Sequence, residues 1–474
     1  MTNDDLARPE GASQRAGAFD GLLPTRSIGL KLILVCGLAL LMAIPALFVY
    51  GVVRERTEGA ERALRDVSVR VGGEQVVLGP VLAVPYVLQA DEESPRLQTY
   101  GLAIAYAETG TARADVTVED RRRGIYPVPV FDAEIDFEAV FDPAALRGAV
   151  PAEATALWRD ARLYMGVSDS RGVKEAYAVV ANGVDVAMEP AAYLGPRQQG
   201  VYAPPQSDMS LAGGVVPGLE TAAGPIEVAA TMRLTGARRL ALGPFAKDTS
   251  FSMVSDWEDP SFVGGVLPDT HNAGDKEVAG FSAAWRVPYL ARGVPGAGAQ
   301  LNLSDVTEAG RRDMAVRFVY TANPYKSVER ALKYAAMFVG FVFLAYFLFE
   351  TVSGARAHPA QYVLVGLAQT IFYLLLLAFA ERVGFDLAFF IAAAMTVLLT
   401  SGYAVSVFRA RKYGLRSLGV LSGIYGLVYV LMRAEDHALI AGAVASFAAI
   451  AVTMYMTRNV DWYGERRLSR SAEA

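Results

Sequence analysis

The sequence predicts an integral membrane protein of α plus β structure, with six transmembrane helices (1 + 5) and a large, mainly antiparallel β domain inserted after the first helix. Two observations predict this fold class. Five long apolar segments crowd the last third of the chain, and a sixth stands alone near the start. The 277 residues of segment 54–330 between them repeatedly alternate apolar and polar side chains, which is the period of a half-buried strand.

The first apolar segment, residues 32–53, is long enough to cross a bilayer, because a hydrocarbon core of about 30 Å needs roughly 20 helical residues. Pro45 is its one irregularity. A cleaved signal peptide is the alternative, but its apolar region is usually only about 7–15 residues and precedes a small-residue cleavage site. Residues 50–53 offer no such site, so we expect an uncleaved anchor.

The five later spans are predicted at residues 332–349, 361–380, 387–408, 418–432 and 438–457. Segment 409–416 separates the third from the fourth of these and contains four Arg or Lys residues. Each would cost roughly 2.5–3.5 kcal/mol at the centre of a transmembrane helix. We therefore expect a loop at 409–416 and two separate helices, not one bent helix.

Positive charge predicts the orientation, because short cytoplasmic loops are enriched in Lys and Arg. With the N-terminus inside, thirteen such residues are cytoplasmic and only Arg382 and Arg433 lie in the short outer loops. Both termini are therefore expected in the cytoplasm and the large insert outside it. The predicted domains are a disordered cytoplasmic tail (1–29), an anchor helix (30–53), a periplasmic β-rich domain of one or two subdomains (54–330), a five-helix bundle (331–457) and a cytoplasmic tail (458–474).

Within the large domain, residues 54–66 mix both charge signs at helical spacing and predict a polar extension of the anchor helix. Strands are expected at 99–106, 114–118, 130–141, 175–188 and 312–320, with turns such as Asn182-Gly183. Regular short strands of this kind predict a sandwich or a barrel-like domain. The single cysteine, Cys36, lies in the first span, so the domain cannot rely on disulfides.

Motifs for catalysis or for cofactors are absent from the sequence. Its net charge of −5 and its lack of a basic stripe argue against nucleic-acid binding. His271, His358 and His437 fall in different predicted compartments and have no zinc-site spacing, so neither a metal nor another cofactor is expected. There is no P-loop or dinucleotide fingerprint.

Segment 166–172 comes nearest to a nucleophile motif, centred on Ser168, but it lacks the final glycine of Gly-x-Ser-x-Gly. A polar turn explains it better, in which Asp169 accepts backbone hydrogen bonds and Gly172 takes a positive φ. An envelope hydrolase using Ser168 remains as an alternative.

Polar residues gather at the two ends of the predicted bundle. The candidate functional cluster on the outer side is Glu381, Arg382, Glu435, Asp436 and His437. Such groups can mark a transport pathway. All of them lie at predicted helix ends, so interfacial anchoring and capping explain them as well.

Several segments together resemble the CreD family of inner-membrane proteins, also called cell envelope integrity proteins. The matching segments are 79–86, 124–130, 168–172, 358–368, 372–377, 435–439 and 457–463. The family-motif residues are His358, Pro359, Gln361, Tyr362, Gly366, Asp461 and Trp462. The resemblance covers nearly everything from about residue 27 to 463. The chain departs from the family pattern at Asn323, Arg382 and His437, which weakens any acid–base role for those positions.

The resemblance implies a Gram-negative inner-membrane location, a periplasmic domain, and a link to envelope integrity and a two-component stress regulon. It implies no reaction. We therefore expect a non-enzymatic envelope protein whose partners are membrane lipids and a periplasmic protein, glycan or lipid. The alternative is a transporter or lipid-handling protein that uses the C-terminal bundle.

Overall fold

The computed structural model describes residues 28–88, 99–191, 209–273, 280–299, 301, 307–308, 312–320, 324–354, 357–433 and 438–460. By their contacts these residues form two compact units. One comprises Met1–Arg56 and Ala322–Ala474, and the other comprises Thr57–Thr321.

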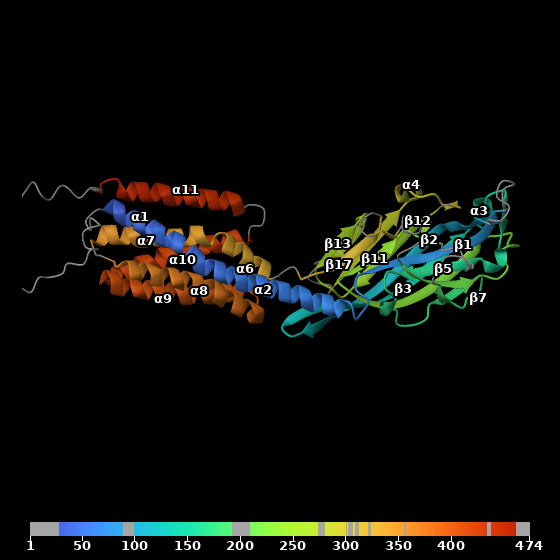
Figure 1. Ribbon diagram of the computed structural model, residues 1–474, viewed down its shortest axis with the longest axis horizontal. Helices are drawn as coiled ribbons and strands as arrows, with labels where there is room; N and C mark the ends of the chain where they lie inside the picture. The colour runs from blue at the N-terminus through green and yellow to red at the C-terminus, as the bar shows by residue number, and fades with distance from the viewer. Residues whose placement is uncertain are drawn as a thin grey trace, which may run out of the picture. The chain divides into compact units, whose positions relative to one another are not determined.

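The first unit is entirely helical. It contains α1 (Ile28–Leu41), the start of α2 (Ala43–Ser68), α6 (Pro324–Lys333), α7 (Ala335–Ser353), α8 (Pro359–Val383), α9 (Phe385–Phe408), α10 (Arg411–Arg433) and α11 (Ala438–Thr457) (Figure 1). Among the described residues, six helices are long and apolar enough to cross a membrane, counting α1 and α2 as one. Together with the sheets of the other unit, they confirm the predicted fold class.

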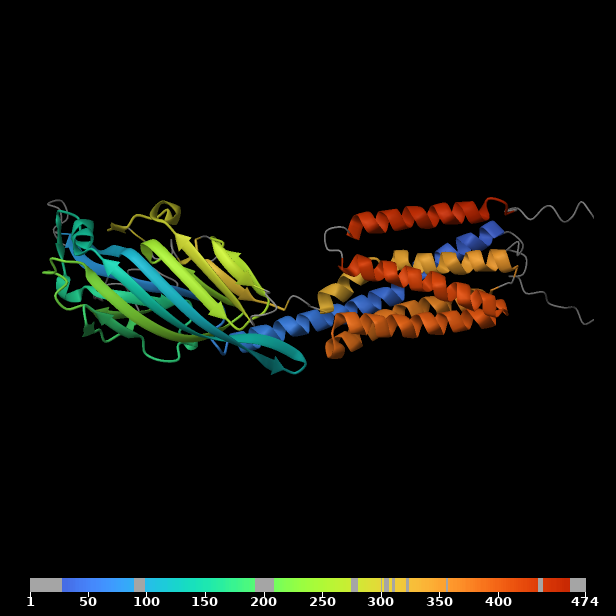
Figure 2. The same ribbon diagram turned by 180° about the vertical axis from the view of Figure 1, so that it is seen from behind.

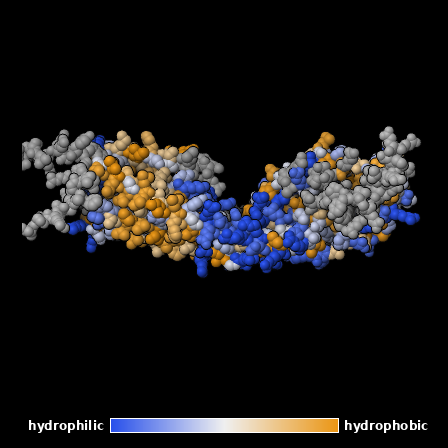
Figure 3. Space-filling view, in the orientation of Figure 1, coloured by the Kyte–Doolittle hydropathy of each residue, from blue (hydrophilic) through white to orange (hydrophobic). Residues whose placement is uncertain are grey.

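The outer surface of the helical unit is apolar, as a lipid-facing surface requires. Figure 3 shows hydrophobic residues covering much of the visible face. Phe447 of α11 is 76% exposed, and Leu398 of α9 is 64% exposed. The first span is interrupted near the predicted irregularity: Met42 separates α1 from α2, and Pro45, in the first turn of α2, has no N–H to donate.

The predicted loop at 409–416 is wrong for most of its length. Arg409 ends α9 in the left-handed conformation, with φ 51°, and α10 already begins at Arg411. The two helices are separate, as predicted, but a two-residue turn connects them. Long basic side chains can keep their charges in water while their stems and backbone remain helical. The cost of burying Arg or Lys at a helix centre therefore does not apply to this first turn.

The second unit begins inside α2, whose helical run to Ser68 confirms the predicted polar extension. Its strands form two sheets joined by the 25-residue strand β2 (Figures 1 and 2). The first part of β2 pairs with β1, and the second part pairs with β3 and β12. One long strand thus serves both layers.

Sheet A contains β1 (Gln75–Leu88), the start of β2 (Thr99–Arg123), β4 (Ala154–Ala156), β5 (Arg162–Val167), β8 (Glu189–Ala191), β9 (Ser210–Val215), β11 (Arg239–Gly243), β13 (Pro260–Gly264), β16 (Ala297–Gly298) and β17 (Met314–Phe318). Sheet B runs β7 (Val184–Asp185), β6 (Ala178–Ala181), β10 (Ile226–Ala237), β3 (Tyr126–Phe141), β2, β12 (Ala246–Ser255), β15 (Phe281–Val287) and β14 (Thr270–Ala273). Most pairings are antiparallel. The described part of the unit also contains two short α-helices, α3 (Pro143–Ala149) and α4 (Tyr289–Arg292), and 3₁₀ turns at Trp158–Asp160 and Ser170–Gly172.

The core lies between the two sheets, because alternate side chains of each strand point to the same side. On β3, Ile135, Phe137 and Phe141 are buried while the residues between them are more exposed. Phe131 of sheet B contacts Phe318 of sheet A, with ring centroids 5.4 Å apart.

The predicted strand at 175–188 is two short strands, β6 and β7, joined by Asn182-Gly183. Both turn residues have positive φ, 48° and 79°. This conformation matches the twist of a tight hairpin and favours Asn-Gly.

Candidate functional site

Helix α8 presents polar side chains to the interior of the helical unit at several levels. Tyr362, Gln369 and Tyr373 are all buried, and their spacing places them on one face of the helix.

The motif residues at the start of α8 form its N-terminal cap. His358 Nδ1 accepts a hydrogen bond from Ala360 N at 3.2 Å, and Gln361 Oε1 accepts one from His358 N at 3.0 Å. Pro359 occupies the first helical turn, where its missing N–H costs nothing. His358 and Gln361 thus satisfy two free N–H groups at the helix end, a capping role that the sequence analysis did not assign to these motif residues.

The carboxylate of Glu350, at the end of α7, interacts with three donor groups. Its carboxylate is 7% exposed and accepts hydrogen bonds from Tyr362 Oη at 2.9 Å and from Ala357 N at 2.8 Å. It also pairs with Lys31 Nζ of α1. One carboxylate therefore links α1, α7 and α8.

Gly366 lies one turn further along α8 and permits a close approach of neighbouring helices. A Cβ at this position would lie 2.6 Å from Met42 Sδ and 2.8 Å from Phe343 Cζ. The motif glycine is thus needed for packing against both neighbours.

A polar cluster occupies the middle of the bundle. Tyr425 Oη of α10 donates to Gln369 Oε1 at 2.7 Å, and Thr396 of α9 lies within hydrogen-bonding reach of the same tyrosine hydroxyl. Among the described atoms, Gln369 Nε2 and Tyr373 Oη are buried without a hydrogen-bond partner. Such groups are costly in hydrocarbon, so this region is suited to receiving a polar ligand or water.

At the far end of α8, Glu381 accepts a hydrogen bond from Tyr325 Oη of α6 at 3.2 Å, and Arg56 Nε of α2 lies 3.9 Å from it. Arg382, the next residue, is exposed. The predicted partners Glu435, Asp436 and His437 lie outside the described residues, as do the motif residues Asp461 and Trp462. The arrangement of the predicted outer cluster therefore stays a prediction.

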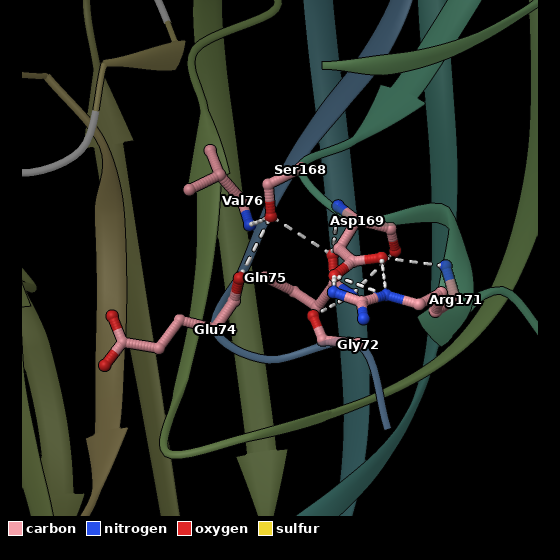
Figure 4. A network of polar contacts seen from close by, with 7 residues as sticks. All are labelled: Gly72, Glu74, Gln75, Val76, Ser168, Asp169 and Arg171. Atoms are coloured by element: carbon pink, nitrogen blue, oxygen red, sulfur yellow. Dashed lines mark hydrogen bonds and ion pairs between the residues drawn. The ribbon is translucent and has the colours of Figure 1, made fainter. Parts of the chain in front are cut away.

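In the β unit, Ser168 takes part in a structural network (Figure 4). Its Oγ accepts a hydrogen bond from Val76 N and donates one to Glu74 O, both at 3.0 Å. Gln75 Nε2 donates to Gly72 O at 2.8 Å and to Asp169 O at 3.0 Å. No histidine takes part among the described residues. The contacts are those of a polar turn that follows β5 and is hydrogen-bonded to the residues at the start of β1.

Asp169 accepts a hydrogen bond from the backbone N–H of Arg171 at 3.0 Å, as predicted for a turn. Hydrogen bonds from the Arg171 guanidinium lower the pKa of the Asp169 carboxyl below its usual value. The positive φ predicted for Gly172 is wrong; a φ of 91° occurs instead at Gly72. Gly172 ends a 3₁₀ turn, and a Cβ there would collide with Thr235 O. Close packing explains this glycine.

A groove crosses the solvent-facing side of sheet B. Its larger part has a volume of about 810 Å³, and an adjoining part that shares Arg113 and Asp136 has about 340 Å³. The charged lining residues are Arg113, Asp115, Asp132, Glu134, Asp136, Glu138, Lys174, Glu175 and Arg233. Lys174 pairs with Asp132, and Arg233 pairs with Glu134 at 3.0 Å and Glu175 at 3.5 Å.

The pairing register sets the charge pattern of this groove. Asp115 on β2 stands directly opposite Glu134 on β3, and Arg113 stands opposite Asp136. Like charges directly opposite one another are unfavourable. The sequence analysis identified the acidic face of β3 but could not find the groove, which depends on strands brought together from distant parts of the chain. Within the described residues, no group of three or more His, Cys, Asp or Glu side chains is placed to hold a metal ion.

Comparison with known proteins gives one consistent result. A family described as "Inner membrane protein CreD" matches residues 27–463. Inner membrane protein CreD of Escherichia coli (strain K12) is 28% identical over 432 residues, which cover 90% of this chain and 92% of that relative.

Replacing Glu350 with Leu should destabilise the helical unit, because Lys31 and the Ala357 N–H lose their shared acceptor. We expect a loss of about 2–4 kcal/mol, less than the roughly 3–5 kcal/mol of a fully buried pair, because Lys31 is 31% exposed. Thermal unfolding of the purified full-length protein in detergent measures it. Glu61→Gln, which breaks an exposed pair with Arg65, should cost at most about 1 kcal/mol. Adding Lys31→Met to Glu350→Leu should recover part of the loss; full additivity would contradict the pairing.

Proposed function

Because the chain belongs to the CreD family of inner membrane proteins, we propose that it supports the integrity of the cell envelope or its response to stress through a periplasmic binding domain. The protein is a multi-pass protein of the inner membrane. In this proposal its helices anchor the β unit, and that unit binds a protein, glycan or lipid of the periplasm without catalysing a reaction.

The distribution of basic residues supports this orientation. Arg409, Arg411, Lys412 and Arg416 cluster at the connection between α9 and α10, which the proposal places in the cytoplasm. An even number of spans returns the C-terminus to the same side as the N-terminus. The β unit, inserted after the first span, then lies in the periplasm.

The groove of sheet B is the observation that carries the binding function. Its volume of about 810 Å³ is that of a typical ligand site, roughly 300–1,000 Å³. Six acidic and three basic residues line its two parts, so the lining carries a surplus of negative charge. Polar and charged side chains on a rigid sheet are suited to selective recognition. The structural role of Ser168 supports a non-enzymatic function.

Cysteine labelling tests the orientation. In a Cys36→Ser background, Val184→Cys lies at a hairpin of the β unit where the native side chain is 51% exposed. A maleimide reagent that cannot cross the inner membrane should label it in cells with a permeabilised outer membrane. Ala410→Cys, in the turn between α9 and α10, should react only after the inner membrane is disrupted. The reverse pattern would contradict the periplasmic placement.

Photo-crosslinking in cells tests the groove. A photoreactive residue in place of Ser252, which lines it, should form an adduct with a periplasmic molecule in the full-length protein. Asp115→Asn combined with Glu134→Gln should reduce the yield by about tenfold or more, since a charged hydrogen bond contributes about 1.5–3 kcal/mol. This double variant removes a like-charge pair and an exposed ion pair between Glu134 and Arg233 that contributes at most about 1 kcal/mol, so it should fold normally. Glu153→Gln, on an exposed loop, is the matched control. Absence of any adduct at Ser252 would refute a binding role for the groove.

A transporter or lipid-handling protein is the second candidate, favoured by the buried polar cluster of Gln369, Tyr373 and Tyr425. In this case polar groups along α8 line a path between its two ends, and Glu381 forms one end of that path. Glu381→Gln should then abolish protection of the envelope in a deletion strain under detergent stress. Arg382→Gln, at the exposed neighbour, should not. Full complementation by Glu381→Gln would remove this candidate.

A further inference from the structure

Four buried polar side chains of the helical unit have an atom without a hydrogen-bond partner among the described residues. They are Gln369 and Tyr373 on α8, Ser401 on α9 and Ser417 on α10. Each side chain belongs to a residue that is at most 5% exposed. Because α9 packs against both α8 and α10, the four side chains belong to one interior. Hydrocarbon offers no hydrogen-bond partner, so such atoms are costly unless a bound molecule satisfies them.

The hydrogens around Gln369 can be assigned one by one. Tyr425 Oη donates its single hydrogen to Gln369 Oε1 at 2.7 Å, which fixes the orientation of the amide group. Thr396 Oγ1 donates its own hydrogen to Ala392 O at 2.9 Å. Within the described part of the chain, both amide hydrogens of Gln369 and the hydroxyl hydrogen of Tyr373 are left without an acceptor. This level of the interior therefore has a surplus of donors.

Ser401 and Ser417 form a second level. A serine inside a helix can bond to a carbonyl of the preceding turn, but neither of these hydroxyl groups does so. Tyr346 of α7 lies near Ser417 but donates its single hydrogen to Thr400 O at 2.7 Å. A Cβ on Gly414, one turn before Ser417, would lie 3.3 Å from the carbonyl oxygen of Ser401. The two serines are therefore on adjoining helices at a similar depth.

Both levels lie deep in the bundle. Gln369 is roughly 15 Å along α8 from its first residue, Pro359, which is about half of a hydrocarbon core of about 30 Å. Along α10, Ser417 is about two turns, or roughly 12 Å, from Tyr425. Surface water at the helix ends therefore does not account for either level.

The interior is also uncharged at these levels. In the described part of the helical unit, Glu350 is the only buried charged side chain, and its carboxylate already has three donors. An ion in a dry interior needs an opposite charge to offset its desolvation. A neutral site with surplus donors suits a neutral molecule that carries an acceptor oxygen. Water is the smallest such molecule, and it can both accept from Gln369 or Tyr373 and donate to a serine oxygen.

We propose that the interior of the bundle binds ordered water at two levels, one held by Gln369 and Tyr373 and the other by Ser401 and Ser417. At the first level a water oxygen accepts the amide and hydroxyl hydrogens. At the second level water bridges the hydroxyl groups of α9 and α10. The inference is independent of transport, because a bundle that only anchors the β unit must satisfy the same buried groups.

Tyr373→Phe tests the first level, because it removes the hydroxyl group and keeps the ring. If water satisfies the hydroxyl, the full-length protein in detergent should unfold about 2–4 °C lower, as expected for one lost hydrogen bond in a unit of this size. If the hydroxyl is dry, its removal relieves a buried unpaired group, and the midpoint should stay unchanged or rise. That second result would overturn the proposal. Tyr455→Phe, at a 63% exposed position of α11, is the matched control and should have no effect.

Thiol reactivity tests the second level in the full-length Cys36→Ser protein. Ser417→Cys replaces a hydroxyl by a thiol of similar shape, and a thiol reacts as the thiolate, which forms where water can take up the proton. The probe is methyl methanethiosulfonate, which is small and uncharged. We expect it to react at least about tenfold faster at residue 417 than at Ala404→Cys, a fully buried position one turn from Ser401 on α9. Equal rates at residues 417 and 404 would overturn the proposal, whatever the effect of Tyr373→Phe.

Discussion

The helical unit depends on how it satisfies the charge of Glu350. A carboxylate at this depth is costly unless every oxygen has a donor. Here the donors come from three directions: the ammonium of Lys31, the hydroxyl of Tyr362 and the backbone N–H of Ala357. Apolar side chains alone give helices in lipid little preference for one neighbour over another. A charged group on α7 whose donors come from α1, from α8 and from the connection before α8 selects one arrangement of the three helices.

The positions of the helices were predictable because hydrocarbon excludes charge over a known thickness. Their ends were less predictable, since an Arg or Lys near the surface can remain in a helix, as in the first turn of α10. The partners of polar residues were not predictable. Lys31 and Glu350 are 319 positions apart, and nothing in the sequence pairs them. The local capping pair of His358 and Gln361, by contrast, has a recognisable spacing and could have been found.

The same contrast appears in the β unit. Alternation along β3 correctly gave one apolar and one acidic face, because that pattern is local. Whether the acidic face meets water, another sheet or a groove depends on β10 and β12, which pair with β3 and with its hairpin partner β2 at large sequence separations. The opposition of Asp115 and Glu134 is likewise a property of register, which strand patterns specify only once both strands are known. Arg233 offsets the charge of Glu134, and the surplus of negative charge on the groove is left for a ligand of positive charge to balance.

The long β2–β3 hairpin contributes to the core of the β unit and also packs against the end of α2. Its inner part supplies residues to the main core. Its outer part contacts the last turns of α2 through the apolar side chains of Val128 and Val130 and the ion pair of Arg123 with Asp66. A helix that leaves a bilayer alone would fray, since helical segments without tertiary packing are only marginally stable in water. The contact of Tyr126 with Gly59 extends that packing further along α2, and a larger residue in place of the glycine would push the strand away.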